Sequence, residues 1–451
     1  MSIKSINPYN EEVLETFERF SNAKVAACLE KSQESFNHWR KTDFAHRSGL
    51  MKRLADILEV DKTKLAETIT LEMGKPIREA LAEVEKCVWV CRFYADHAES
   101  FLKDEIIDTE ASKSWVQYQP LGPVLAIMPW NFPLWQVFRF AAPGLMAGNV
   151  GLLKHASNVT RCALNIEDAF KQADFPEGAF QSLIVDSDQV KGIIESNVVK
   201  AVTLTGSEKA GASVASIAGE NIKKSVLELG GSNAFIVLDD ANLNEAVDIA
   251  IKSRFQNAGQ SCIAAKRFIV LKSVYDGFLV KFVDGVKNLK AGDPMDSNTD
   301  IGPLARVDLA TELDEQVKSS LNKGAKLVIG GEQQRARYSP AVLTHVTPDM
   351  PAFREELFGP VAPVIKVKNE NEALELANRS SFGLGATVCT TDLDRAQKFI
   401  DGIEDGAVFI NALVKSDPRL PFGGTKRSGF GRELSHHGIR EFTNIKTVFI
   451  K

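Results

Sequence analysis

The first hundred residues have the spacing of apolar positions that is typical of amphipathic helices. From residue 10 to residue 98, apolar side chains such as Leu50, Leu54 and Leu58 recur every three or four positions between Lys, Glu and Asp. Such a spacing gives each helix an apolar stripe that must be buried against another layer. We therefore predict a helical layer over residues 10–98.

Beyond residue 115, short apolar runs alternate with segments of helical spacing. Residues 115–118 alternate like a strand, and residues 124–128 form an apolar run typical of a buried strand. We predict further strands over residues 150–154, 182–185, 201–205, 234–238, 267–271, 364–367 and 408–410, and a helix over residues 243–255. This alternation predicts an α/β fold with two doubly wound, Rossmann-like parallel sheets covered by helices.

The chain length also favours two domains. Its 451 residues exceed the size at which a single hydrophobic core stops growing, about 250–300 residues. The segment 228–232 contains the adjacent glycines Gly230 and Gly231, which allow a sharp backbone turn. We place the crossing between the two domains there and expect a ligand cleft between them.

Composition and charge exclude several classes of protein. Hydrophobic residues make up 44% of the chain and charged residues 25%, which is ordinary for a globular protein. The net charge of -5 gives no general attraction to nucleic acid or to an anionic membrane surface. No apolar run reaches the roughly 18–20 residues that span a bilayer, and the N-terminus does not resemble a secretory signal. We expect a cytoplasmic protein with a small-molecule ligand.

Six cysteines are scattered along the chain, which argues against a disulfide framework. Cys87 and Cys91 lie four residues apart, but no second pair of Cys or His residues completes a four-ligand set. We therefore expect no metal site and read these two as core residues.

Cys262 is the candidate nucleophile. It ends a turn of small residues, 257–262, where a thiol can face a cleft; an inert buried thiol is the alternative. Glu228 is the candidate base if burial raises its pKa, and a surface carboxylate is the alternative. Asn131 lies in a loop of aromatic residues and prolines, where its amide can stabilise a developing oxyanion. A helix cap is the alternative for this Asn.

Residues 205–211 follow a predicted strand and open a predicted helix, where backbone N–H groups can hold a phosphate. The glycine spacing is not that of the common dinucleotide motif. Ala212 stands where a P-loop would have Lys. By itself this stretch is a weak indication of a nucleotide site.

Seven motifs together resemble those of the aldehyde dehydrogenase superfamily, in the same order along the chain. They are residues 129–133 (Pro-Trp-Asn-Phe-Pro), 153–154 (Leu-Lys), 205–207 (Thr-Gly-Ser), 228–231 (Glu-Leu-Gly-Gly), 259–262 (Gly-Gln-Ser-Cys), 355–360 (Glu-Glu-Leu-Phe-Gly-Pro) and 421–424 (Pro-Phe-Gly-Gly). The resemblance implies NAD(P)-dependent oxidation of an aldehyde to a carboxylate through a thioester on Cys262.

The resemblance also implies the role of each site residue. Cys262 is the nucleophile, the Asn131 amide and the Cys262 N–H bind the oxyanion, and Glu228 activates the water that opens the thioester. The residues assigned to the cofactor are Trp130, Lys154, Ser157, Gly206, Ser207, Glu356 and Phe358. Phe422 is assigned to the substrate.

Two departures from the family pattern follow Lys154. His155 replaces the usual Pro, and Ser157 stands where NAD-preferring members often place Glu. No carboxylate at this position repels a 2′-phosphate. We therefore predict that NADP is accepted as well as NAD; whether NADP is preferred stays open.

The chain most resembles the short bacterial succinate-semialdehyde dehydrogenases. Arg139 falls eight residues after Asn131, on the helix that borders the substrate tunnel, and we predict that it grips the distal carboxylate of a semialdehyde. A structural Arg is the alternative. Gln256 occupies the place where some relatives have a second Arg. One of the two Arg side chains that could bind the distal carboxylate is therefore missing. The expected substrate is succinate semialdehyde, with another aliphatic or aromatic aldehyde as the alternative.

The family fold implies a cofactor-binding domain (residues 1–100 and 120–227) and a catalytic domain (residues 228–433). Residues 101–119 and 434–451 would form a small β oligomerisation arm, from which we predict a homodimer or homotetramer. Two other classes stay open. One is a cofactor-free Cys-dependent hydrolase, because thioester chemistry needs no nicotinamide by itself. The other is a catalytically silent structural protein on the same fold.

Overall fold

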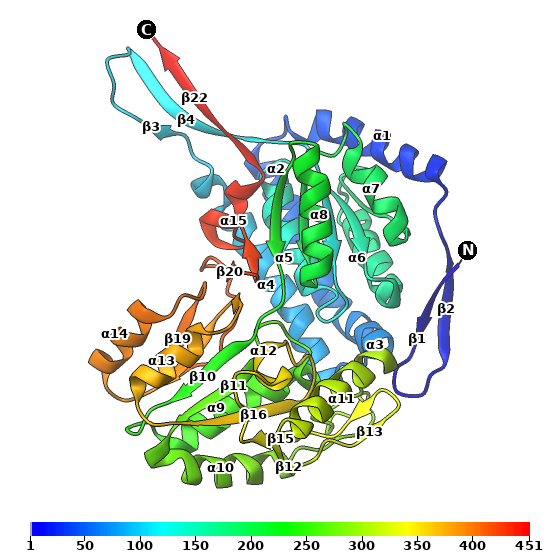
Figure 1. Ribbon diagram of the computed structural model, residues 1–451. Helices are drawn as coiled ribbons and strands as arrows, with labels where there is room; N and C mark the ends of the chain where they lie inside the picture. Colours follow the sequence, from blue (N-terminus) through cyan, green and yellow to red (C-terminus); the bar gives the residue numbers. More distant parts are fainter. Residues whose placement is uncertain (1) are drawn as a thin grey trace.

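The computed structural model describes residues 2–451, which form two α/β bodies and a projecting arm (Figure 1). A six-stranded sheet lies in the first body and a seven-stranded sheet in the second. The arm leaves the first body and carries the C-terminus at its tip. This arrangement confirms the α/β class with two predominantly parallel sheets.

The first sheet has the strand order β21-β9-β8-β5-β6-β7. Its strands are β5 (Pro123–Met128), β6 (Val150–His155), β7 (Phe180–Ser182), β8 (Ala201–Thr205), β9 (Lys224–Glu228) and β21 (Gly429–Phe430). All neighbours are parallel except β21, which pairs antiparallel with β9 at the edge. The helices around this sheet are α1 (Asn22–Trp39), α2 (Phe44–Val60), α3 (Lys62–Met73), α4 (Ile77–Phe101), α5 (Trp135–Met146), α6 (Thr160–Gln172), α7 (Ser187–Glu195) and α8 (Glu208–Glu220), with the short 3₁₀ helix η1 (Ser157–Val159).

The second sheet has the order β12-β15-β16-β11-β10-β18-β19. Its strands are β10 (Asn233–Val237), β11 (Ala265–Leu271), β12 (Lys326–Ile329), β15 (Ala341–Thr344), β16 (Val361–Val367), β18 (Ala386–Cys389) and β19 (Val408–Ile410). Only the edge strand β12 is antiparallel. The helices are α9 (Leu243–Phe255), α10 (Lys272–Lys287), α11 (Val307–Asn322), α12 (Pro351–Arg354), α13 (Glu370–Asn378) and α14 (Leu393–Gly402), with the 3₁₀ helix η2 (Gln256–Gly259). Short pairs complete the body: β13 (Gln333–Gln334) with β14 (Arg337–Tyr338), and β17 (Phe382–Gly383) with β20 (Thr425–Lys426).

Central strands are mostly apolar because helices cover both faces of each sheet. Every residue of β10 and of β11 is buried. The chain passes from the first sheet to the second between the end of β9 and the start of β10, as the paired glycines predict. At Gly231 an added Cβ would lie 2.6 Å from the carbonyl oxygen of Cys262, so only glycine allows this close approach.

The arm is a three-stranded antiparallel sheet of β3 (Glu105–Ile106), β4 (Lys113–Pro120) and β22 (Thr443–Ile450). Residues 434–451, which the sequence assigns to the arm, include more than a strand of this sheet. Helix α15 (Ser435–Glu441) packs against α4 and α5 of the first body, and only β22 joins the arm. The domain boundaries themselves remain a prediction.

Two predicted elements differ from the structure. The helical layer begins at Asn22 rather than at residue 10, because β1 (Ser2–Ile6) and β2 (Val13–Glu18) form a hairpin first. The hairpin buries Ile3 and Phe17, a contact that helical spacing does not reveal. The strand predicted over 182–185 is β7, which ends at Ser182 where its pairing with β6 stops. No helix within residues 2–451 is long and apolar enough to cross a membrane.

Candidate active site

Cys262 lies between η2 and β11 and lines two cavities at once. One cavity, of about 630 Å³, extends along the ends of β8 and β9. The other, of about 310 Å³, extends along α4, α5 and the loop of residues 413–416. Gln136 is the other residue common to both linings. A thiol between two cavities can contact a ligand in each of them.

Residues 257–262 form the turn that carries the candidate nucleophile Cys262, called the nucleophile turn below. This turn has an unusual backbone conformation. Asn257 and Ala258 have φ values of 55° and 51°, in the left-handed region that residues with side chains rarely adopt. Their conformation depends on outside contacts: the Asn257 N–H donates to Glu79 on α4, at 2.6 Å. Lys266 fixes the other side of the turn, where its Nζ donates to the carbonyl oxygens of Ser261 (2.7 Å) and Cys262 (2.9 Å). These contacts set the direction of the Cys262 side chain.

The thiol itself is not ionised at neutral pH. Burial raises the pKa of Cys262 to about 11, although Arg139 and Lys266 act in the opposite direction. Only a small fraction of the side chain is therefore thiolate, the reactive form. A nearby base, or an electrostatic change when ligands bind, must favour loss of the proton.

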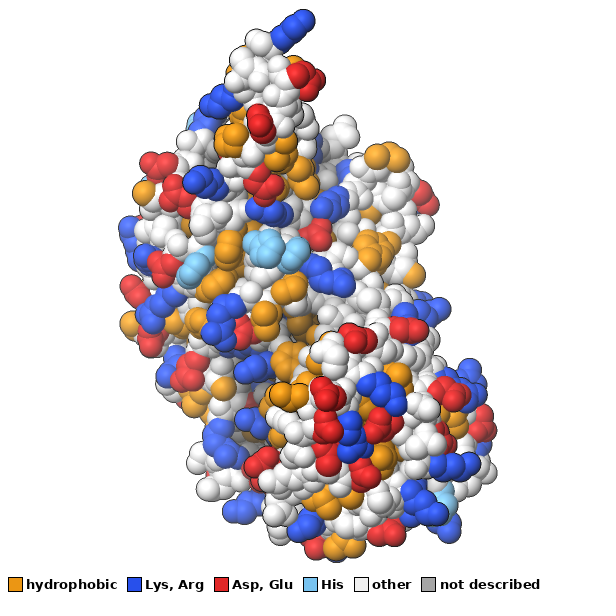
Figure 2. All heavy atoms as spheres, turned by 90° about the vertical axis from the view of Figure 1, so that its left-hand side faces the viewer, with side chains coloured by type: hydrophobic (Ala, Val, Ile, Leu, Met, Phe, Trp, Pro, Cys, Tyr) orange, Lys and Arg blue, Asp and Glu red, His pale blue; other side chains and the backbone are white. Residues whose placement is uncertain are grey.

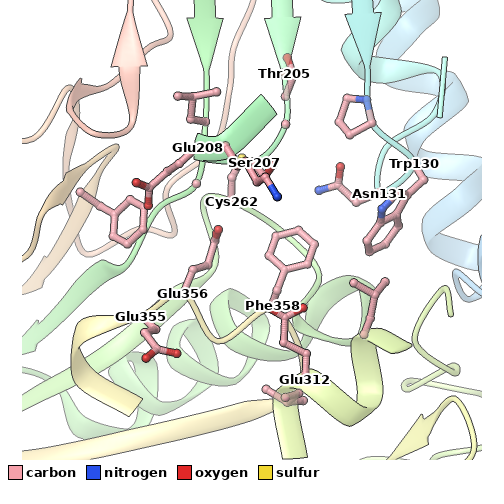
Figure 3. A pocket seen from close by; sticks show the side chains of 18 of the residues that line it. Trp130, Asn131, Thr205, Ser207, Glu208, Cys262, Glu312, Glu355, Glu356 and Phe358 are labelled. Atoms are coloured by element: carbon pink, nitrogen blue, oxygen red, sulfur yellow. The ribbon is translucent and has the colours of Figure 1, made fainter. Parts of the chain in front are cut away.

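Asn131 faces the same cavity as Cys262 (Figure 3). Its Nδ2 donates to the carbonyl oxygen of Gln260 at 3.0 Å, and its Oδ1 accepts from Gln136 at 3.1 Å. The side-chain amide of Asn257 donates to the backbone carbonyl oxygen of Asn131. These contacts fix the amide plane and use only one of its two N–H groups, so the second can donate to an oxygen on a ligand.

His155, the residue in place of the usual Pro, supports the Asn131 loop. Its Nε2 lies 2.8 Å from the carbonyl oxygen of Pro133, and its Nδ1 lies 2.9 Å from the N–H of Ala156. The ring donates to Pro133 if the proton is on Nε2 and to the carbonyl oxygen of Met128, 3.1 Å from Nδ1, if the proton is on Nδ1. Burial lowers the pKa of His155 to about 4, so the ring stays neutral at physiological pH.

Glu228 lies at the end of β9 in a buried cluster with Glu433 and Arg139 and is not in either cavity lining. Its side chain is 2% exposed, and no described donor bonds to either carboxylate oxygen. Burial, with Glu433 next in importance, raises the pKa of Glu228 well above its usual value, and Arg139 only partly opposes this. Burial of this kind favours the protonated form of the carboxyl, and in this conformation Glu228 lies outside both cavity linings.

Arg139 does not have the free guanidinium that the sequence led us to expect. Its Nε lies 2.7 Å from Oε2 of Glu433, both side chains are buried, and its Nη2 lies 3.4 Å from the Thr205 hydroxyl. The ring of Phe422 covers the guanidinium with 4.7 Å between the ring centroid and Cζ. Arg139 and Phe422 line the smaller cavity, and the guanidinium of Arg139 also contacts Glu433 within the protein.

The larger cavity has the features of a dinucleotide site. Gly206 and Ser207 precede α8, whose first N–H groups face this cavity, and Ser207 caps the helix by accepting from the N–H of Ala210. An added Cβ on Gly206 would meet only one atom within 4 Å, so the backbone stays open to a ligand. Trp130 and Phe358 pack edge to face in the wall, with 5.7 Å between ring centroids. The cavity thus offers donors for a phosphate and an aromatic wall for a flat ring.

Glu356 also lines this cavity but contacts protein groups. Its Oε1 lies 3.0 Å from Lys266 Nζ and accepts from the N–H of Gly231 at 3.1 Å. An added Cβ on Gly230 would overlap its Oε2. Glu356 is therefore linked through Lys266 to the carbonyl groups of the nucleophile turn.

The structure does not bring every predicted residue into the cavities. Lys154, at the end of β6, and Ser157, in η1, are absent from both linings. Burial lowers the pKa of Lys154, which Asp186 partly opposes. Among residues 2–451, no three His, Cys, Asp or Glu side chains cluster as a metal site would require.

Three residues of the site were missed in the sequence. Glu433 neutralises Arg139, and Lys86 and Ser416 line the smaller cavity. Lys86 is on a helix whose spacing indicated only an amphipathic surface, and Ser416 is in a loop. No local pattern distinguishes these residues from ordinary surface positions.

Comparison with known proteins shows which family this chain belongs to. The model of the aldehyde dehydrogenase family matches residues 1–448. A Synechocystis protein named as a probable succinate-semialdehyde dehydrogenase (NADP+) is 54% identical over 453 residues and covers 100% of both chains. A Mycobacterium tuberculosis protein named succinate-semialdehyde dehydrogenase (NADP+) 1 is 50% identical over 456 residues, again over 100% of both. The crystal structure of succinic semialdehyde dehydrogenase from Streptococcus pyogenes with NADP+ has a TM-score of 0.97 at 40% identity and covers 99% of each chain. The chain therefore belongs to the aldehyde dehydrogenase family.

Proposed function

We propose that this protein oxidises succinate semialdehyde to succinate with NADP as the cofactor. The observation that carries the proposal is the position of Cys262 between two cavities of different chemistry. The larger cavity presents a helix N-terminus and an aromatic wall. The smaller is lined by the cationic residues Lys86, Arg139, Lys252 and Lys415 and by no Asp or Glu. An aldehyde that carries a carboxylate fits such a lining.

The residues around Cys262 would act in turn on the substrate. The thiolate of Cys262 attacks the aldehyde carbon, and the free N–H of Asn131 and the backbone N–H of Cys262 bind the oxygen. When NADP is bound, its nicotinamide supplies the oxidising power of the reaction. Glu228 takes a proton from the water that opens the thioester, which releases the carboxylate and regenerates the thiol.

Support for NADP comes from the sequence and from the relatives. Ser157 places no negative charge where a 2′-phosphate would be repelled. Relatives at 50–54% identity carry NADP+ in their names. We assign Gly206 and Ser207 to the pyrophosphate and Trp130 and Phe358 to the nicotinamide end. Lys154, Ser157 and Glu356 are assigned to the riboses and the 2′-phosphate.

A panel of aldehydes tests the proposal, with absorbance at 340 nm as the measurement. We expect kcat/KM for succinate semialdehyde to exceed that for butanal, which has the same chain length without the carboxylate. We expect NADP to support turnover at least as well as NAD. A hundredfold preference for NAD would contradict the cofactor assignment, and ester hydrolysis without any change at 340 nm would indicate a hydrolase instead. Cys262→Ala is the inactive control.

We also propose that the arm joins copies of this chain into a homodimer or homotetramer. The arm sheet exposes Ile106, Ile445, Phe449 and Ile450, each between 47% and 67% exposed. Figure 2 shows hydrophobic side chains on the arm and on the surface just below it. An exposed sheet with apolar side chains is poorly suited to water and well suited to pairing. All six cysteines are free, which fits a reducing compartment, and we propose a cytoplasmic location.

A further inference from the structure

The smaller cavity contains a cationic side chain that has no acidic partner. Lys86, on α4, makes no ion pair with any carboxylate in residues 2–451. Glu83, one turn earlier on the same helix, pairs with Lys75 instead. Asp417, in the loop beside the cavity, pairs with Arg419 at 2.7 Å. The nearby acids are thus already neutralised by other cations.

Lys86 is nevertheless held in a defined position. Its Nζ lies 4.2 Å from the centroid of the Trp135 ring, a cation–π distance, and donates to the Ser416 hydroxyl at 2.9 Å. The remaining N–H groups of the ammonium have no protein acceptor among the described residues. A cation that is positioned but not neutralised favours the binding of an anion.

Ser416 also favours the binding of an anion beside Lys86. Its oxygen accepts from Lys86 and also from the indole N–H of Trp135, at 3.0 Å. A hydroxyl oxygen has two lone pairs, and these two donors use both. The Ser416 hydroxyl can then act only as a donor toward a ligand. Lys86 and Ser416 together present N–H and O–H donors to the cavity, which suits a carboxylate.

We propose that Lys86 on α4 is a further residue that recognises the distal carboxylate of the substrate, on the same cavity as Arg139 of α5. The inference deepens the proposed function and rests on it. Lys86 and Cys262 line the same cavity of about 310 Å³, so one small molecule can contact both. Of the other cations of this lining, Lys252 and Lys415 are exposed and add only a screened attraction, and Arg139 pairs with Glu433.

Replacement of Lys86 tests the inference in the full-length enzyme. Lys86→Met keeps an unbranched side chain over Trp135 and removes the charge. We expect kcat/KM for succinate semialdehyde to fall about 10- to 100-fold, mainly through KM, as for the loss of a charged hydrogen bond. For butanal we expect a change of less than about twofold. Lys86→Arg keeps the charge and should retain most of the preference.

Lys41→Met is the matched control, because Lys41 is an exposed lysine outside both cavity linings. It should change kcat/KM for either substrate by less than about twofold. Equal losses for succinate semialdehyde and butanal in Lys86→Met would show a structural role and overturn the inference. So would a larger selective loss in Lys41→Met.

A pH profile of the wild-type enzyme tests the inference without any substitution. The pKa of Lys86 is lowered to about 8, first by burial and then by Arg139. Cys87, Glu83 and Asp417 raise it by smaller amounts. We expect the ratio of kcat/KM for succinate semialdehyde to kcat/KM for butanal to fall above pH 8, because the neutral amine no longer attracts the carboxylate. Ionisation of the nucleophile affects both substrates and cancels, so a flat ratio would overturn the inference.

Binding of succinate separates the failure of this inference from the failure of the proposed function. Calorimetric titration of the wild type and of Lys86→Met with succinate should give a Kd about tenfold or more weaker in the variant. An unchanged Kd would overturn the assignment to Lys86 even if the enzyme prefers succinate semialdehyde. A wild type with no preference over butanal would contradict the proposed function, while a selective loss of succinate binding would still support the Lys86 site.

Discussion

At the scale of single residues, two members of a buried group of three titratable side chains, Arg139 and Glu228, affect the pKa of Cys262. Arg139 pairs with Glu433, and Glu228 shares their burial without any hydrogen-bond donor of its own. Burial raises the pKa of Glu228 and of Glu433, because the single guanidinium of Arg139 cannot stabilise two buried carboxylates. A carboxyl that keeps its proton costs less to bury and can lose that proton when water and substrate arrive.

Glu228→Gln should separate the two halves of the reaction. We expect steady-state kcat to fall about 100- to 10,000-fold, because no side chain is left to take the proton from the attacking water. A first burst of absorbance at 340 nm, measured by stopped flow, should remain. Glu312→Gln, an exposed position in the larger cavity, is the control and should stay within about twofold. Loss of the burst together with the steady-state rate would argue against this role for Glu228.

The same variant should change how stability depends on pH. Because the pKa of Glu228 is raised in the folded protein, the unfolded chain loses this proton first as pH rises above about 4.5. The wild type therefore loses stability as pH rises above that value toward the folded pKa. Gln cannot ionise, so the Tm advantage of Glu228→Gln over the wild type should widen from pH 5 to pH 8. A constant or shrinking difference would contradict the raised pKa.

At the scale of elements, the first turn of α4 holds the nucleophile turn of the other body. Glu79 accepts from the N–H of Asn257, which has a left-handed φ of 55°. Burial raises the pKa of Glu79 to about 7, and either form of the carboxyl can accept this hydrogen bond. The position of Cys262 therefore depends on packing between α4 and η2.

Glu79→Ala and Glu79→Gln form a matched pair for this contact. Alanine leaves the Asn257 N–H without a partner, which should lower the free energy of unfolding by about 1–3 kcal/mol. It should also lower kcat about tenfold or more, because a small displacement of a nucleophile is costly. Glutamine supplies a carbonyl acceptor, so its Tm and kcat should stay near those of the wild type. Equal behaviour of the two variants would show that the hydrogen bond does not position the turn.

At the scale of the whole molecule, the two bodies meet at the cavities and the arm extends away from them (Figure 1). The arm buries little apolar surface within the chain, and its exposed residues Ile445 (62%) and Phe449 (50%) lie four positions apart in β22. Positions with this spacing share one face of a strand. That face is the expected contact between copies.

Charges on this face should dissociate the assembly. We expect the double variant Ile445→Lys, Phe449→Lys to have a lower mass by light scattering at micromolar concentration, toward that of one chain, because like charges would meet across the contact. Ile222→Lys, at a position 92% exposed and outside the arm, is the control and should keep the wild-type mass. A wild type that is already monomeric, or a double variant of unchanged mass, would contradict the predicted role of the arm.

The sequence by itself determined the α/β class and the change of sheet at Gly230 and Gly231, and it singled out Cys262 as the candidate nucleophile. These features are local: strands, paired glycines and the turn before Cys262 can be recognised within a few residues, because backbone conformation and apolar spacing are short-range properties. The β1–β2 hairpin was missed because its stability comes from a pairing that helical spacing does not record.

Only the tertiary structure decided which charges are free. Arg139 and Glu433 lie 294 positions apart in the sequence and meet in the buried cluster, whereas Lys86 finds Ser416 but no acid. A charge is available to a ligand only if no opposite charge in the folded protein already neutralises it, and that depends on contacts between distant segments. For this reason the sequence pointed to Arg139 alone, and the packing of α4 and α5 with the loops around them adds Lys86 to the same cavity as a cation without an acidic partner.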